Sequence, residues 1–189
     1  MKIIRKIKSI IKSFLGVDRG PNLQELKAMG MKVGENFIFD AGSTRFDSSH
    51  CWLIEIGNDV TFGPQVYLLA HDASTKKELG YTKIGRVVIQ DKTFIGANTI
   101  IMPGVTVGKG GIVGTGSIVT HDVPAGCVYA GNPAKFICTT EEYYKKQKDN
   151  LSSLPVFDGS YTVGGNVTEE KKQQMIAELK NNGNKGFVV

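Results

Sequence analysis

The sequence predicts an all-β solenoid, in which short strands and turns wind into stacked parallel coils. Glycine is frequent, at 23 of 189 residues, as tight corners require. A six-residue period also runs from Ile89 to Pro124. Its first position holds six β-branched aliphatic residues in succession: Ile89, Ile95, Ile101, Val107, Val113 and Val119. Neither a helix of period 3.6 nor a strand of period two produces this register.

The same period defines the expected coils. Each hexapeptide supplies a strand and a turn, and three of them close one triangular coil of about 18 residues, with neighbouring coils about 4.8 Å apart. A weaker version of the period places further residues at first positions: Val33, Phe39, Ile56, Phe62 and Leu68. Residues 43–52 break its register, and residues 72–86 lack it altogether. We therefore expect about four to five coils over residues 33–138, with residues 72–86 extruded as a loop.

Helical segments are expected on both sides of the solenoid. Residues 2–15 place apolar side chains at three- and four-residue steps with lysines between them, a pattern typical of an amphipathic helix. Two interpretations of this leader, residues 1–32, stay open: peripheral contact with an anionic membrane surface, or packing on the body or on a sister subunit. Residues 139–189 are expected to form a helical tail, in which Thr139 and Thr168 begin helices.

Charge separates the leader from the rest of the chain. The net charge of +5 arises in the first twelve residues, which hold five basic residues and no acid, so the remaining 18 basic residues balance 18 acidic ones. A balanced body argues against a nucleic-acid partner. No apolar run reaches the ~20 residues of a membrane span. The three cysteines lack metal-ligand spacing, as expected of reduced thiols in a cytoplasmic protein.

Three histidines are the candidate bases near neutral pH: His50, His71 and His121. His71 lies where a regular coil gives way to the loop, a place where sites are readily built. His121 lies in the turn before Pro124 and is expected at a solvated corner. His50 lies one period before Ile56, either buried for structure or lining the same cleft as His71. From the residues alone, a catalytic and a structural role for His71 are equally supported.

Two stretches of sequence resemble a known family. The blocks IGANTIIMPGVTVGKGGIVGTGSIVTHDVPAG, followed by GNPAKFI, resemble the hexapeptide-repeat acyltransferases. The segment DSSHCWLIEIGNDVTFGPQVYLLAHDAST is similar to the branch with maltose and galactoside acetyltransferases, and closest to enzymes that acetylate capsule and O-antigen polysaccharides. The resemblance covers about residues 33–138. It implies a left-handed parallel β-helix, acetyl-CoA as co-substrate, and a homotrimer with active sites at subunit interfaces.

The resemblance also implies a mechanism and its residues. His71 would be the general base of an acetyl-CoA-dependent O-acetyltransferase that transfers acetyl directly to a saccharide hydroxyl, without a required metal. Asp72 is a candidate to orient its imidazole, although consecutive residues on a strand point apart. The residues implied to bind the cofactor are Gly96, Ala97, Gly114, Thr115, Ser117 and, at the CoA phosphates, Lys135. Residues 43–52 depart from the repeat, and the acceptor-side candidates are Asp47, His50 and Trp52.

Other functions remain to be separated from this one. An N-acetyltransferase acting on an amino sugar, free or nucleotide-linked, is compatible with the same scaffold. A non-catalytic β-helix that serves as an assembly module would lack acetyl-CoA binding. A zinc carbonic anhydrase would need three converging histidines, whereas those of this chain are scattered in sequence. The favoured hypothesis places the enzyme in the cytoplasm, with the leader near the inner face of a membrane.

Overall fold

The computed structural model describes residues 20–189 in two compact units, which divide between Thr140 and Glu141. The predicted amphipathic segment, residues 2–15, lies outside the described residues, and its two interpretations stay predictions. Within residues 20–189, no helix is both long enough and apolar enough to cross a membrane.

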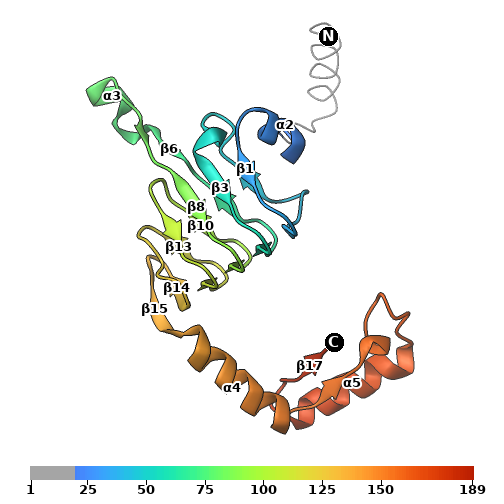
Figure 1. The fold of residues 1–189 in the computed structure, drawn as a ribbon. Coiled ribbons are helices and arrows are strands. Elements are labelled where there is room, and N and C mark those ends of the chain that lie inside the picture. Colours follow the sequence, from blue (N-terminus) through green and yellow to red (C-terminus); the bar gives the residue numbers. More distant parts are fainter. Residues whose placement is uncertain (1–19) are drawn as a thin grey trace, which may run out of the picture. The chain divides into compact units, whose positions relative to one another are not determined.

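The first unit is built mainly on three sheets that the chain visits in turn (Figure 1). One sheet contains β1 (Lys32–Val33), β3 (Ile54–Ile56), β8 (Val87–Ile89) and β11 (Thr106–Val107). The second contains β4 (Thr61–Phe62), β9 (Phe94–Ile95), β12 (Ile112–Val113), β14 (Cys127–Gly131) and β15 (Ala134–Thr139). The third contains β2 (Arg45–Phe46), β5 (Tyr67–Leu68), β10 (Ile100–Ile101) and β13 (Ile118–Val119).

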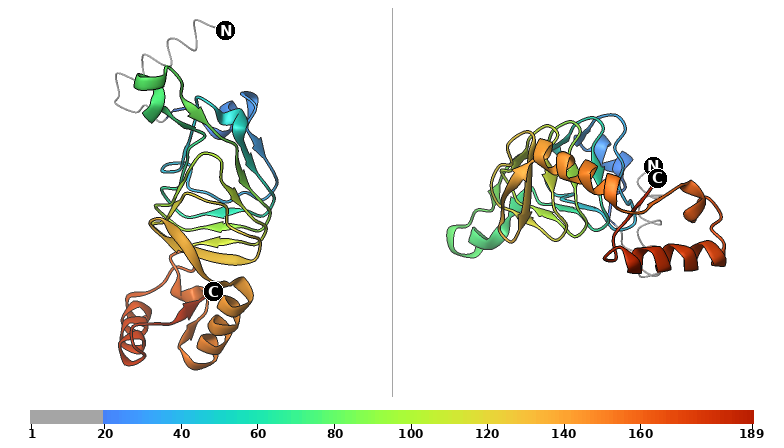
Figure 2. Two further views of the ribbon diagram at one scale, coloured as in Figure 1. Left: turned by 90° about the vertical axis from the view of Figure 1, so that its left-hand side faces the viewer. Right: turned by 90° about the horizontal axis from the view of Figure 1, so that it is seen from below.

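Each return to a sheet adds one parallel strand beside the previous one, so the chain forms a parallel solenoid (Figure 2). Four full turns are present, and β14 begins a fifth that ends when β15 pairs with it in antiparallel fashion. The predicted number of coils is therefore confirmed. The hand of the coil stays the prediction made from the resemblance.

The strand register confirms the predicted inward positions. Ile89 pairs with Val107, and the next two first positions of the period pair in the same way on the other sheets: Ile95 with Val113 and Ile101 with Val119. All six side chains are at most 1% exposed. Stacked coils thus build three aliphatic ladders, and each fully buried side chain contributes about 1.5–3 kcal/mol of hydrophobic stabilisation.

The first coil is built differently. Phe37, Phe39, Phe46 and Phe62 form an aromatic cluster, in which the rings of Phe37 and Phe39 stack with centroids 4.6 Å apart. Helix α2 (Leu23–Ala28) lies at this end of the solenoid and buries Leu26 in the core. A short 3-10 helix, η1 (Cys51–Leu53), then replaces a regular turn. The break in register predicted at residues 43–52 corresponds to this irregular coil.

The predicted extruded loop is an ordered hairpin. Strand β6 (His71–Asp72) pairs in antiparallel fashion with β7 (Lys83–Ile84), and its tip carries η2 (Ala73–Thr75) and α3 (Lys76–Leu79). Figure 1 shows the hairpin projecting from the solenoid wall. An ion pair of 2.6 Å between Lys83 Nζ and Asp72 Oδ2 closes its base. The six-residue period could not reveal this hairpin, because β6 and β7 pair with each other and not with a strand of a neighbouring coil.

The second unit contains helices α4 (Thr140–Ser153) and α5 (Glu169–Asn181), with η3 (Gly159–Tyr161) between them. Thr168 caps α5 as predicted, since its side chain accepts a hydrogen bond from Lys171 N–H. The sequence did not predict the parallel pair of β16 (Val156–Phe157) and β17 (Phe187–Val188). This pair joins segments far apart in the chain, which local patterns do not reveal.

Candidate active site

The candidate site forms where two neighbouring coils leave the third sheet. Strand β2 of the first coil pairs with β5 of the second, with Phe46 opposite Leu68. Asp47 follows Phe46 directly, and its backbone N–H donates to the Leu68 carbonyl at 3.0 Å. The chain after β5 therefore runs beside Asp47, which brings His71 next to a carboxylate 24 residues earlier in the sequence.

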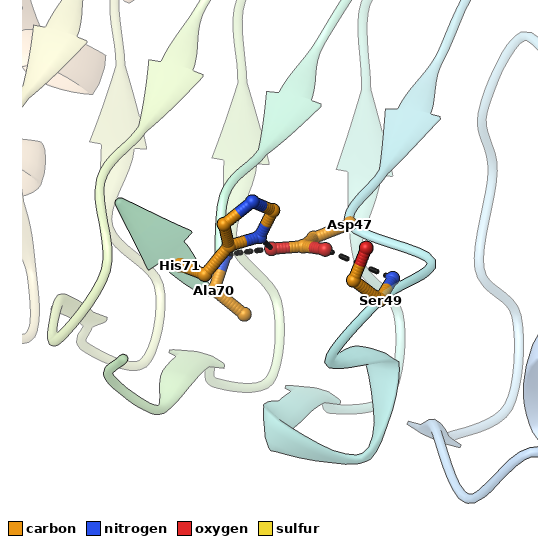
Figure 3. A network of polar contacts seen from close by, with 4 residues as sticks. All are labelled: Asp47, Ser49, Ala70 and His71. Carbon is orange, nitrogen blue, oxygen red and sulfur yellow. Dashed lines mark hydrogen bonds and ion pairs between the residues drawn. The ribbon is translucent and has the colours of Figure 1, made fainter. Parts of the chain in front are cut away.

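Asp47 is held by three donors (Figure 3). Its Oδ2 contacts His71 Nδ1 and also accepts a hydrogen bond of 3.0 Å from Ala70 N–H. Its Oδ1 accepts one of 3.0 Å from Ser49 N–H. Because two of these donors are backbone groups on neighbouring coils, the carboxylate is fixed by the solenoid itself.

The electrostatics of the Asp47–His71 pair determine the tautomer of neutral His71, that is, which ring nitrogen carries the hydrogen. Burial of Asp47 disfavours its charged form, but hydrogen bonds from His71 and Ala70 N–H outweigh it, so the pKa of Asp47 lies below its usual value. The ionised carboxylate has no proton to donate, so His71 Nδ1 carries the hydrogen of the contact. In neutral His71, Nε2 then carries the lone pair, and it points away from Asp47 (Figure 3).

Asp72 does not orient the imidazole, which corrects the expectation from sequence. Its carboxylate bonds to Lys83 Nζ and to Ser74 N–H instead. Consecutive residues on an extended strand point in opposite directions, so Asp72 faces away from the contact that His71 makes. The partner of His71 is Asp47, which sequence analysis placed among the acceptor-side candidates.

His50 and Trp52 complete a row of rings beside His71. The centroid of the His50 ring lies 5.2 Å from that of His71 and 5.4 Å from that of Trp52. Trp52 is 54% exposed, whereas the Nδ1 atom of His50 is buried and has no hydrogen-bond partner among the described residues. The structure therefore brings Asp47 and His50 next to His71 and places Trp52 on the other side of His50. His121 lies elsewhere, exposed, beside Thr120 Oγ1 at 2.8 Å.

The small residues predicted to line a cofactor groove stack at one corner of the solenoid. A Cβ added to Gly96 would lie 2.5 Å from Thr115 N, and one added to Gly63 would lie 2.6 Å from Ala97 N. These contacts show that successive corners lie directly against each other. Gly114 occupies the next corner, where an added Cβ would lie 2.8 Å from Ala130 Cβ.

Two further predicted cofactor residues have contrasting environments. Ser117 is fully buried, and its hydroxyl donates to the Gly114 carbonyl and accepts from Gly131 N–H at 3.1 Å. It therefore supports the corner from within. Lys135 is exposed on β15, opposite Ala130 of β14, in the hairpin that ends the solenoid. A positive side chain at that place is available to an anionic ligand.

Comparisons with known proteins confirm that the six-residue period is a hexapeptide repeat. Residues 86–121 match the family model of the bacterial transferase hexapeptide (six repeats). "Putative acetyltransferase YvoF" of Bacillus subtilis (strain 168) is 39% identical over 118 residues, which are 62% of this chain and 66% of that protein. A 2,3,4,5-tetrahydropyridine-2,6-dicarboxylate N-acetyltransferase of Staphylococcus aureus (strain JH9) is 52% identical over 68 residues, 36% of this chain and 28% of that enzyme.

Among solved structures, a maltose O-acetyltransferase from Clostridium difficile 630 has a TM-score of 0.45 and 29% identity, covering 60% of this chain and 72% of that one. The chain thus spans just under two thirds of YvoF and less than a third of the staphylococcal enzyme. The chain therefore carries the bacterial transferase hexapeptide repeat, and around that repeat it is similar in sequence to acetyltransferases.

Proposed function

We propose that the protein is an acetyl-CoA-dependent O-acetyltransferase with a left-handed β-helix, and that it acetylates a hydroxyl of a saccharide. The observation that carries this proposal is the Asp47–His71 pair, an imidazole oriented by a buried carboxylate at the edge of the solenoid. The similarity to acetyltransferases supports acetyl transfer as the reaction class. A non-catalytic assembly module would not need such a pair.

The pair supports direct transfer by general base catalysis. Nε2 of His71 takes the proton of the acceptor hydroxyl as the oxygen attacks the thioester carbonyl of acetyl-CoA. The imidazolium that forms is stabilised by the ionised Asp47, which also holds the ring in place. When the tetrahedral intermediate collapses, the carbon–sulfur bond breaks and His71 returns the proton to the thiolate of CoA. No acyl-enzyme forms, and no metal is needed.

The cofactor is proposed to lie along the corner of small residues. Close packing of Gly96, Ala97, Gly114 and Thr115 leaves a smooth surface for a pantetheine arm, and Ser117 supports it from within. Lys135 is placed to meet the CoA phosphates. In a homotrimer, this corner would form the groove between neighbouring subunits, so that each active site needs two chains.

The acceptor is proposed to bind on the side of Trp52. An exposed aromatic ring suits the apolar face of a sugar, and His50 lies between it and His71. A surface polysaccharide or its precursor is the favoured substrate. We further propose the domain division made from the sequence: an amphipathic helical leader at 1–32, which contacts the inner membrane face or packs in the trimer, an enzyme domain at 33–138 in the cytoplasm, and a helical tail at 139–189.

Incubation of the purified protein with acetyl-CoA and a panel of saccharides tests the function. Release of the CoA thiol that depends on an added saccharide is the expected result. His71→Ala should abolish it, whereas His121→Ala, at an exposed corner, should retain normal turnover. If His71→Ala turned over normally, the general-base assignment would be wrong. If no acetyl-CoA bound to the wild type, a non-catalytic assembly module would be the better-supported hypothesis.

A second candidate is an N-acetyltransferase acting on an amino sugar. The staphylococcal relative, an N-acetyltransferase by name, supports it, and a neutral His71 can take a proton from an attacking amine as well as from a hydroxyl. The product separates the two candidates, because hydroxylamine cleaves an acetyl ester under mild conditions and leaves an acetamide intact. A hydroxylamine-resistant product on an amino sugar would replace the first proposal with the second.

A further inference from the structure

We propose that Asp47, His50 and His71 form a binding site for one divalent transition-metal ion of the zinc class, and that this ion inhibits the enzyme. Each residue offers one ligand atom, and the three atoms lie within 4.8 Å of one another. No other group of three such side chains comes so close within residues 20–189. Two imidazoles and one carboxylate form a typical ligand set for zinc, with a fourth position left open.

His50 provides the independent observation. Its Nδ1 atom is buried without a hydrogen-bond partner in the described structure, although a buried polar nitrogen is normally paired. Its ring lies 5.2 Å from that of His71, between centroids. The proposed mechanism leaves this nitrogen unused, and a metal ion would satisfy it.

Small movements are enough to close the site. Bonds of about 2.0–2.2 Å in a tetrahedron bring the ligand atoms to about 3.3–3.5 Å from each other. Asp47 is already held by Ala70 N–H and Ser49 N–H, each at 3.0 Å, which orients its carboxylate as outer hydrogen bonds do in metal sites. Rotation of the two histidine rings would bring their nitrogens to bonding distance.

Inhibition follows from the chemistry of His71 and rests on the proposed function. If the ion binds Nε2, the lone pair that accepts the substrate proton is occupied. If it binds Nδ1, the hydrogen of the neutral ring moves to Nε2, which then cannot accept a proton. The second mode also separates Asp47 from the imidazole proton that it holds. The ion and the general base therefore exclude each other.

Cobalt(II) provides a readout that is independent of activity. Untagged full-length protein is stripped with a chelator and titrated with Co²⁺, and we expect visible absorption bands of a tetrahedral site at one ion per chain. Zn²⁺ should displace the cobalt and abolish the bands. His50→Gln and Asp47→Asn should each weaken zinc binding by at least about tenfold. His121→Gln is the matched control and should bind zinc as the wild type does, because His121 lies outside the group.

Several outcomes would overturn the proposal. Absence of cobalt bands in protein whose circular dichroism is native would exclude the site, as would equal weakening by His50→Gln and His121→Gln. Zinc should inhibit the stripped wild type, and His50→Gln should need at least about tenfold more zinc for the same fractional inhibition. If stripping abolished the activity and added zinc restored it, the ion would be a cofactor, and the proposed inhibitory role would be wrong. The proposed function fails separately, if the wild type transfers no acetyl group either after stripping or after zinc is added back.

Discussion

The regular coils and the first coil solve the same packing problem in different ways. Between Val87 and Val119, aliphatic side chains repeat in strict register, and backbone pairing stacks each coil on the next. In the first coil, phenylalanine rings fill the interior, and side chains such as Asp40 and Asp47 hold the turns. All of Asp47, His50 and Trp52 lie in the irregular coil. The comparison teaches that the regular part supplies repeated backbone stacking, whereas the irregular coil places Asp47 and His50 beside His71 of the next coil.

The largest effect should follow from removing the charge of Asp47. An amide in Asp47→Asn cannot stabilise an imidazolium and can donate to Nδ1, which favours the wrong tautomer. Turnover should fall by roughly 10²–10⁴-fold. Asp122→Asn is the matched control, because Asp122 accepts a backbone hydrogen bond in a regular coil, from Thr106 N–H at 2.7 Å. CoA release measured for both variants tests whether turnover depends on the carboxylate that the first coil places beside His71.

A larger loss of turnover in Asp47→Asn than in Asp122→Asn would also show that turnover depends specifically on the carboxylate of Asp47. If Asp122→Asn reduced turnover as much as Asp47→Asn, the effect would reflect general damage to the solenoid. Thermal unfolding of both variants, followed by circular dichroism, checks that each remains folded.

The next largest effect concerns stability of the regular coils. Ile95 is completely buried between Phe62 and Val113 on one ladder. Ile95→Ala should lower the free energy of unfolding by about 2–5 kcal/mol, because the close-packed ladder cannot collapse around the cavity. Ile84→Ala, at a position 60% exposed on the hairpin, should change it by less than about 0.5 kcal/mol. Urea denaturation at one protein concentration compares them, and equal effects would contradict a core built on ladders.

These ladders also explain how much of the fold the sequence could predict. A period of six is a local property, so it identified the buried first positions and the number of coils. The irregular coil has no such signal, because the strand pairing of Phe46 with Leu68 spans a longer stretch than the pairing of Ile101 with Val119. His71 was found because it begins the excursion, whereas the role of Asp47 depends on that unpredicted pairing. The assignment of Ser117 to the cofactor site came from the resemblance, which did not predict that its side chain is buried.

A smaller effect is expected at the corners of the regular coils. A Cβ on Gly96 would lie 2.5 Å from Thr115 N, so Gly96→Ala should push two coils apart and destabilise the protein by roughly 1–3 kcal/mol. Gly159→Ala is the control, since nothing lies within 4 Å of an added Cβ there. If the corner is the pantetheine site, Gly96→Ala should also raise KM for acetyl-CoA. Unchanged stability and KM in Gly96→Ala would show that the corner tolerates a larger residue.

The smallest effect is expected in the pH dependence of stability, which should differ between the turn at Asp40 and turns held by the backbone alone. Asp40 accepts a hydrogen bond of 2.6 Å from the Ser43 hydroxyl and one of 2.9 Å from Gly42 N–H, and these bonds lower the pKa of Asp40. Since the folded pKa lies below the unfolded value of about 3.9, the turn gains stability above that pH and loses it as the pH falls through the folded pKa. Turns held only by backbone hydrogen bonds have no such dependence. The turn at Asp40 should therefore loosen in acid before those turns do.

Ser43→Ala tests the cause of this shift. Loss of the hydroxyl should move the pKa of Asp40 upward, toward its ordinary value, in an NMR titration of the carboxyl carbons. Asp158 is a matched control in the other unit, because Ser160 lowers its pKa through the same kind of contact. The pKa of Asp158 should stay unchanged in Ser43→Ala. An unchanged Asp40 would mean that Gly42 N–H alone holds the turn, in which case the first coil, like the regular ones, depends on its backbone.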